Sequence, residues 1–86
     1  TTLLRCKAAG ENQFDSCPAG VLRMEDAQAS VVVQNQAGEQ FTINFMKGYV
    51  NAANRELEAY LEGDTWILEF ANGEVWEVPI AAIEGG

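Results

Sequence analysis

Short turns that contain glycine constrain this chain more than any other sequence feature. Two runs of β-branched and aromatic residues, Ala29–Gln34 and Glu39–Phe45, flank the turn sequence Gln36-Ala37-Gly38. A three-residue loop with glycine in the left-handed position commonly joins two antiparallel strands. Counting across this loop brings apolar side chains together on one face, in the pairs Val33–Phe41, Val31–Ile43 and Ala29–Phe45. Because a slip of one residue would move this set to the other face, the turn and the hydrophobic pattern specify the same register.

The C-terminal third of the chain has the same organisation. The runs Thr65–Phe70 and Glu74–Val78 flank the turn sequence Ala71-Asn72-Gly73. A two-residue Asn-Gly loop would set Leu68 against Glu77, which places an apolar residue opposite a charged one. A three-residue loop instead pairs apolar residues with each other, Leu68 with Trp76 and Trp66 with Val78. The hydrophobic pattern therefore favours the longer loop.

Residues 51–62 fit two different local structures. By propensity, residues 52–61 predict a helix, with Asn51 as its N-cap and Gly63 as the glycine that ends it. By alternation, residues 57–61 predict a strand that Gly63-Asp64 joins to the next run in a two-residue hairpin. This second register also pairs only apolar residues: Leu61–Trp66, Ala59–Leu68 and Leu57–Phe70. On local grounds both structures remain open.

The two cysteines, Cys6 and Cys17, are separated by a polar, turn-like segment. Such a segment offers little core in which free thiols could be buried, so we predict a disulfide and an oxidising compartment, either secreted or periplasmic. The closed loop would stabilise the fold by roughly 3 kcal/mol in the chain-entropy model. Two cysteines cannot form a structural zinc site, and their spacing is not that of a C-x-x-C redox motif.

The charge balance excludes several classes of function. The chain has a net charge of −8 and no histidine. Nucleic-acid binding depends on Lys and Arg, so we expect no nucleic-acid partner. The lack of histidine excludes catalytic relays and metal sites that need imidazole. No stretch approaches the roughly 20 apolar residues of a membrane span, and we expect no cofactor and no metal. From residue 56 onward there are eight carboxylates and no Lys or Arg, so the negative charge is concentrated in the last third.

The two C-terminal hairpins predict a candidate protein-binding surface. If both form, one face collects three glutamates around three apolar or aromatic residues: Glu58, Tyr60, Ile67, Glu69, Val75 and Glu77. Glu58 would lie directly opposite Glu69, and like charges so placed destabilise a strand pair. Carboxylates around an apolar centre would suit a basic protein partner.

Two other interpretations of this face stay open. The more usual explanation of such a face is an ordinary solvated surface, on which glutamates discourage edge-to-edge aggregation. Facing glutamates could also serve as a general acid and base in a small enzyme. An exposed sheet face would raise a glutamate pKa little, however, so we predict no catalytic residues. Trp66 and Trp76 point inward in this register and are expected in the core.

The order of the motifs resembles a group of small secreted or periplasmic bacterial proteins of uncharacterised function. The matching pieces are Cys17-Pro18-Ala19-Gly20, Ala37-Gly38, Phe45-Met46-Lys47-Gly48, Glu62-Gly63-Asp64-Thr65-Trp66, Trp76-Glu77-Val78-Pro79 and Gly85-Gly86. The resemblance implies a mainly β domain in which residues 51–61 are extended at least at their end. It implies no activity, and Ile80 departs from the polar or acidic residue that usually follows the proline. A fainter similarity in size, strand content and charge is to small periplasmic lysozyme inhibitors.

Together these patterns predict an all-β domain spanning residues 1–86. We expect a disulfide-stapled segment at 1–28, a meander of five or six antiparallel strands at 29–83 curled into a barrel or sandwich, and a flexible tail at 84–86. The alternative is an α+β fold with a helix at 52–61. The expected function is that of a non-catalytic interaction domain or accessory subunit that binds a basic protein. The alternatives are an inhibitor of a basic hydrolase such as lysozyme and a small carboxylate-based enzyme.

Overall fold

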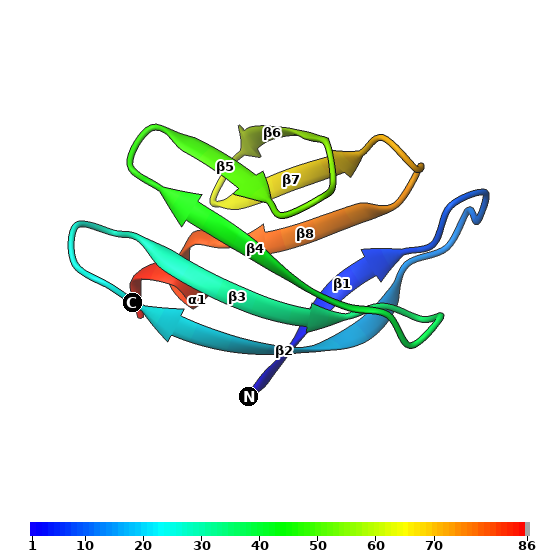
Figure 1. Cartoon of the computed structure of the whole chain (residues 1–86), viewed down its shortest axis with the longest axis horizontal. Coiled ribbons are helices and arrows are strands. Elements are labelled where there is room, and N and C mark those ends of the chain that lie inside the picture. Colours follow the sequence, from blue (N-terminus) through cyan, green and yellow to red (C-terminus); the bar gives the residue numbers. More distant parts are fainter. Residues whose placement is uncertain (86) are drawn as a thin grey trace.

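Antiparallel strands account for most of the chain, as the turns and alternating patterns predicted. The structure is a computed structural model that describes residues 1–85. Within this range the chain forms eight strands and one short helix (Figure 1): β1 (Thr2–Lys7), β2 (Asp15–Arg23), β3 (Ala29–Gln34), β4 (Gln40–Met46), β5 (Tyr49–Ala52), β6 (Leu57–Glu62), β7 (Thr65–Phe70), β8 (Val75–Pro79) and α1 (Ile80–Glu84). The all-β class is confirmed. Residues 29–83 hold six strands, and β1 and β2 add two more in the N-terminal segment.

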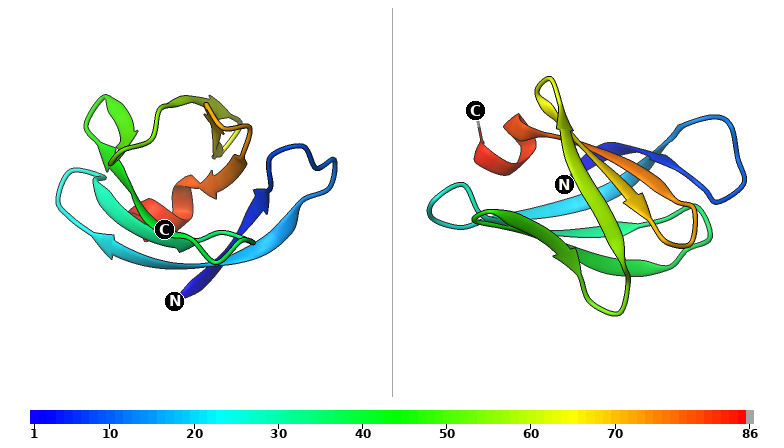
Figure 2. Two further views of the ribbon diagram at one scale, coloured as in Figure 1. Left: turned by 45° about the vertical axis from the view of Figure 1, so that its right-hand side comes forward. Right: turned by 90° about the horizontal axis from the view of Figure 1, so that it is seen from above.

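The strands form one antiparallel sheet that curls into a nearly closed barrel (Figure 2). β1 lies between β2 and β8, and it thereby joins two series of sequential hairpins, β1 to β5 and β6 to β8. β5 and β6 are the two edges of the sheet. Within the described residues these two edges do not pair with each other, so the barrel is open between β5 and β6.

The registers predicted from the turns are confirmed. β3 pairs with β4 through Val31 and Ile43, and β7 pairs with β8 through Leu68 and Trp76. β6 pairs with β7 across a two-residue turn that ends with Glu62 opposite Thr65. In the two three-residue loops, the glycines have φ angles of 87° and 99°, a region that other residues occupy only with strain.

The helix considered for residues 52–61 does not form, so the α+β alternative is wrong. Ala52 is buried at the end of β5, where it lies opposite Ile43. Asn54 then turns the chain with a φ of 61°, and the following residues form β6. Leu57 and Ala59 pack against the core from this strand. Helix preferences of at most about 1 kcal/mol per residue are outweighed by the burial and pairing gained in the sheet.

The core fills the interior of the barrel and is centred on aromatic contacts. Trp76 and Leu68 are completely buried, and the Phe41 ring makes edge-to-face contacts with the rings of Phe70 and Trp76. Trp66 is only partly buried and packs against Phe45 at the other side of the core. Most of this core comes from inward-facing positions of the predicted registers, which is why the hydrophobic pattern identified it.

The sulfur atoms of Cys6 and Cys17 lie at disulfide-bonding distance, as predicted. Both residues are buried, and their Cα atoms are 6.0 Å apart on the neighbouring strands β1 and β2. The segment expected as a stapled loop is therefore a hairpin of two strands. The sequence did not predict these strands because the residues that join them are polar and carry no clear two-residue or three-residue turn signal.

The helix α1 closes one end of the barrel. Its Ile83 is buried, and Gly85 is its left-handed C-cap. Of the predicted tail at 84–86, Glu84 therefore belongs to α1, Gly85 caps it, and residue 86 lies outside the described residues. Within residues 1–85, no helix has the length and hydrophobicity needed to cross a membrane.

Candidate functional site

The surface predicted to bind a protein lies on the outer face of β6, β7 and β8. Alternation along the paired strands places its six residues on this face: Glu58, Tyr60, Ile67, Glu69, Val75 and Glu77. As the register predicted, Glu58 lies directly opposite Glu69. The outer face therefore does bring glutamates from adjacent strands together.

Two of the six residues differ from what the sequence suggested. Ile67 lies outside the main core cluster but is only 8% exposed, because neighbouring side chains cover it. It cannot provide an exposed apolar centre. Glu77 forms an ion pair with Arg5 of β1, with 2.8 Å between Nε and Oε1. This contact depends on the pairing of β1 with β8, which joins distant parts of the chain and has no turn to predict it.

Tyr60 is the accessible aromatic group on this face, with 43% of its surface exposed. Its hydroxyl donates a hydrogen bond to Glu69 Oε2 at 3.2 Å. Partial burial, this hydrogen bond and the negative charges of Glu69 and Glu62 raise the pKa of Tyr60 above its ordinary value. The protonated hydroxyl thus serves as a hydrogen-bond donor to the carboxylate of Glu69.

Glu62 extends the same face. It continues the alternation of Glu58 and Tyr60 along β6 and is exposed. The sequence prediction omitted Glu62, although the two-residue period of the strand would have found it. We call Glu58, Tyr60, Glu62 and Glu69 the acidic β6–β7 surface. Glu58 and Glu69 also border a surface hollow of about 580 Å³. Exposed carboxylates in this arrangement can accept charge-assisted hydrogen bonds from Lys or Arg side chains.

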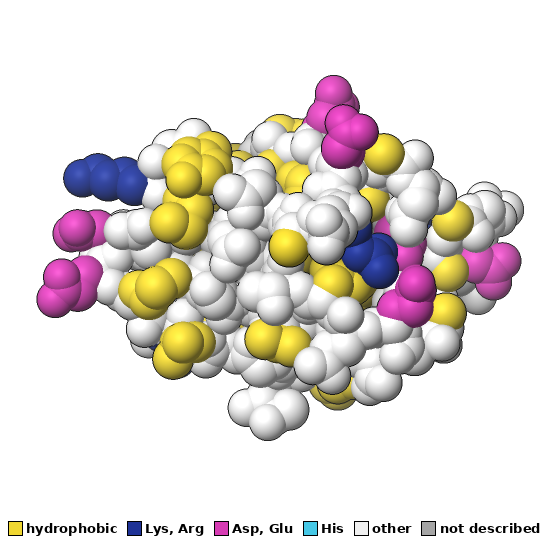
Figure 3. Space-filling view, in the orientation of Figure 1, with side chains coloured by type: hydrophobic (Ala, Val, Ile, Leu, Met, Phe, Trp, Pro, Cys, Tyr) yellow, Lys and Arg dark blue, Asp and Glu magenta, His cyan; other side chains and the backbone are white. Residues whose placement is uncertain are grey.

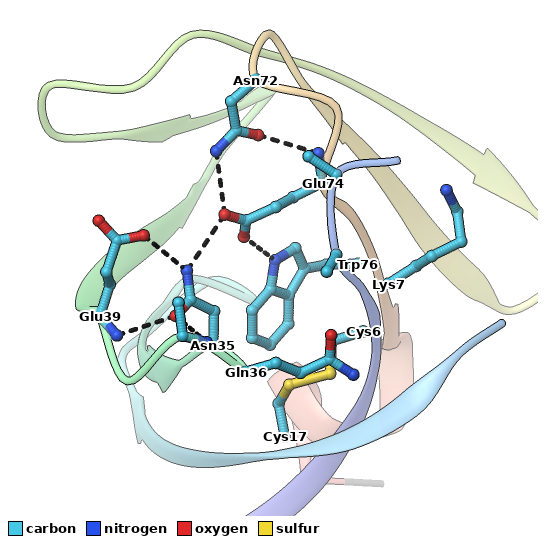
Figure 4. Close-up of a pocket in the computed structure, with 12 residues that line it drawn as sticks. Cys6, Lys7, Cys17, Asn35, Gln36, Glu39, Asn72, Glu74 and Trp76 are labelled. Carbon is cyan, nitrogen blue, oxygen red and sulfur yellow. Dashed lines mark hydrogen bonds between the residues drawn. A yellow bond between two sulfur atoms is a disulfide. The ribbon is translucent and has the colours of Figure 1, made fainter. Parts of the chain in front are cut away.

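A second polar cluster lies at one end of the barrel around a buried carboxylate (Figure 4). Glu74 is 6% exposed. Its Oε1 accepts a hydrogen bond from Trp76 Nε1 at 3.1 Å. Its Oε2 accepts hydrogen bonds from Asn72 Nδ2 at 2.9 Å and Asn35 Nδ2 at 3.1 Å. A buried carboxylate needs such donors because its removal from water is costly.

The two asparagines in this cluster also shape the hairpin loops. Within the β3–β4 loop, the side-chain oxygen of Asn35 accepts two backbone N–H groups. Within the β7–β8 loop, the side-chain oxygen of Asn72 accepts the backbone N–H of Glu74. Glu74 thus ties together two loops that belong to different series of hairpins. In the predicted register Glu74 lies two positions from Trp76 and so on the same inward face. The sequence therefore indicated that Glu74 is buried.

Arg55 completes the cluster from the segment between β5 and β6. Its guanidinium carbon lies 3.8 Å from the centre of the Phe41 ring. Its nitrogens lie 3.6 Å from Glu74 Oε2 and 3.7 Å from Glu39 Oε1. The hydrogen bond from Asn35 and the positive charge of Arg55 lower the pKa of Glu39 below its ordinary value.

A pocket of about 340 Å³ opens beside this cluster. Its lining includes Glu74, Trp76, Lys7 and the two cysteines, which Figure 4 shows around one cavity. Both oxygens of the Glu74 carboxylate are already hydrogen-bonded within the protein, which leaves little capacity for a ligand. We interpret the cluster as a clamp that fixes this end of the barrel.

Neither a metal-binding group among the described residues nor a similar protein points to a function. Within residues 1–85, no three acidic or cysteine side chains are grouped so that they could hold a metal ion. Comparison with protein-family models, with curated proteins and with solved structures finds no match to this chain. The arrangement and charge of the side chains are therefore the basis for inferring a function.

Proposed function

We propose that this protein is a non-catalytic secreted or periplasmic interaction domain that binds a basic protein partner through the acidic β6–β7 surface. The observation that carries the proposal is the set of three exposed glutamates, Glu58, Glu62 and Glu69, on the same face as Tyr60, whose hydroxyl bonds to Glu69. Within residues 1–85, none of the three glutamates takes part in an ion pair. They are available to a cationic partner, and like charges this close gain stability when such a partner neutralises them.

The distribution of charge over the molecule supports this choice of surface. Arg5 and Arg55 pair with Glu77 and Glu74, which reduces the effect of those two carboxylates. The face formed by β2 to β5, seen in Figure 3, is mostly uncharged, and most acidic side chains there lie at its margin. A net charge of −8 would speed the approach of a basic protein, and the acidic β6–β7 surface would direct where it docks.

Two further observations support the other parts of the proposal. A cysteine pair at bonding distance in a small domain is typical of proteins that fold in an oxidising compartment. The facing glutamates Glu58 and Glu69 are both exposed to water, an environment that seldom tunes a carboxylate for acid–base catalysis. These features favour a binding role over the carboxylate-based enzyme.

The test is affinity capture with two variants of equal net charge. Glu58→Lys/Glu69→Lys reverses two charges on the acidic β6–β7 surface, and Glu25→Lys/Glu84→Lys reverses two exposed glutamates elsewhere. Each pair moves the net charge from −8 to −4, because every Glu→Lys change adds two positive units. We expect the first variant to capture at least about tenfold less partner from an envelope fraction than the wild type does. The second variant should capture as much as the wild type. Equal capture by both variants would remove this surface from consideration.

A narrower version of the proposal makes the partner a basic hydrolase such as lysozyme, which the protein would inhibit by covering its active site. The strongly negative charge and the small, disulfide-linked barrel favour this version. A lytic assay at low salt tests it, since electrostatic binding is strongest there. Inhibition that salt weakens is expected, and no inhibition at micromolar protein would exclude the hydrolase while leaving other basic partners.

A further inference from the structure

β6 is an open edge of the sheet. It pairs with β7 on one side, and among the strands of residues 1–85 it has no hydrogen-bonded neighbour on the other. β5, the opposite edge, comes next to it in the barrel without forming a ladder with it (Figures 1 and 2). An open edge presents backbone N–H and C=O groups that can pair with a strand from another chain.

The hydrogen-bond phase of the β6–β7 hairpin identifies which backbone groups are free. In a two-residue hairpin the residues that flank the turn exchange backbone hydrogen bonds, so Glu62 bonds to Thr65. Every second residue of β6 then bonds to β7, and the bond from Ala71 N–H to the carbonyl of Glu56, at 2.9 Å, fits this phase. The residues between them direct their backbone groups away from β7: Leu57, Ala59 and Leu61.

The side chains along this edge define what could pair with it. Glu58, Tyr60 and Glu62 point to the outer face, and the alternate residues point toward the interior. Leu61 is 50% exposed and lines a pocket of about 250 Å³ together with Trp66. The edge therefore offers carboxylates on one face and apolar surface on the other.

We propose that an extended segment of a basic protein adds to β6 as an antiparallel strand, with Lys or Arg on the outer face and apolar side chains on the inner face. The inference rests on the proposed function and specifies how the partner docks. The outward cations would pair with the acidic β6–β7 surface, and the inward apolar residues would contact Leu61. Backbone hydrogen bonds would form at Leu57, Ala59 and Leu61.

A second copy of this chain is a poor occupant of the same edge. Antiparallel pairing of two β6 strands centred on Tyr60 would set Glu58 of each copy opposite Glu62 of the other. Like charges directly opposite destabilise a strand pair, and each copy already carries a net charge of −8. The glutamates thus discourage self-association while they favour a cationic strand.

Short peptides of alternating Lys and Val test this inference. In the proposed arrangement the Val side chains face inward with those of Leu57, Ala59 and Leu61, so the backbone N–H groups of Val point at β6. A peptide N-methylated at every Val would therefore lose every hydrogen bond that it donates to β6. A peptide N-methylated at every Lys has the same composition and number of methyl groups but keeps them. We expect the first to bind at least about tenfold more weakly than the second at low salt, as measured by calorimetry.

The outcomes separate this inference from the proposed function. Equal affinity of the two N-methylated peptides, together with loss of binding to Glu58→Lys/Glu69→Lys, would overturn strand addition and leave the acidic β6–β7 surface as the docking site. Binding that is the same for the wild type and for that variant would contradict the proposed function itself. Failure of the unmodified peptide to bind would overturn strand addition.

Discussion

At the scale of single residues, the buried glutamate at the end of the barrel links three separate parts of the chain. Glu74 receives hydrogen bonds from Asn35, Asn72 and Trp76, and Arg55 lies 3.6 Å from it. Such a network stabilises a fold only while every donor has an acceptor, because an unpaired buried polar group is costly. Its position between two hairpin loops makes it a structural group rather than a binding one.

Replacing this carboxylate by an amide should therefore destabilise the protein strongly. Glu74→Gln keeps the side-chain shape but turns one acceptor into a donor that faces the N–H groups of the network, and it removes the charge beside Arg55. We expect the free energy of unfolding to fall by about 2–4 kcal/mol, measured by denaturant unfolding. The control Glu84→Gln changes an exposed residue of α1 and should stay within about 0.5 kcal/mol of the wild type. Equal effects of the two substitutions would contradict the clamp.

The raised pKa of Tyr60 gives a pH dependence on the proposed binding surface. The folded state holds the phenolic proton more tightly than the unfolded state, so this stabilisation is complete below the ordinary tyrosine pKa of about 10. It is lost as the pH rises from there through the folded-state pKa of Tyr60. In a Tyr49→Phe background, which leaves one tyrosine, we expect the absorbance of tyrosinate to appear above pH 10. Adding Glu69→Gln should lower the pKa of Tyr60 toward 10. An unchanged pKa would show that Glu69 does not raise it.

At the scale of elements, short turns made most of the sheet predictable. The loops before β4 and β8 and the turn before β7 each fixed a register in which apolar residues face one another. At residues 52–61 propensity left a helix open beside the strand, and pairing in β5 and β6 decides for the strand. The pairing of β1 with β8 had no local signal, because it joins the two ends of the chain. The sequence consequently missed the Arg5–Glu77 ion pair, which depends on it.

The β1–β2 hairpin owes part of its stability to the cysteine pair. Cys6 and Cys17 are 11 positions apart, and a link across a loop of this length removes entropy mainly from the unfolded chain. We expect the double variant Cys6→Ser/Cys17→Ser to lose about 3 kcal/mol of unfolding free energy in a thermal or denaturant experiment. Reduction of the wild type with dithiothreitol should give a loss of similar size. A loss below about 0.5 kcal/mol in both would mean that the hairpin does not depend on the link.

At the scale of the whole molecule, the fold places the carboxylates that pair with arginines apart from those that are free to bind a partner. Two arginines from distant segments neutralise Glu77 and the buried Glu74, whereas the glutamates of the acidic β6–β7 surface have no such partners among residues 1–85. The outer-face position of Glu58, Tyr60 and Glu69 was predictable from alternation, but the covering of Ile67 was not, since it depends on neighbouring side chains. Among the described residues, the barrel thus presents carboxylates without ion-pair partners on and beside its open edge.

Amide hydrogen exchange along β6 in the free protein tests the open edge most directly. We expect protection to alternate: the amides of Glu58 and Tyr60, which bond to β7, should be protected, and those of Ala59 and Leu61 should exchange at least about a hundredfold faster. Exchange can be followed residue by residue in nitrogen–proton correlation spectra. Uniform protection of all four amides would show that β6 already has a partner on both sides, and it would contradict the claim that this edge is free to receive a strand.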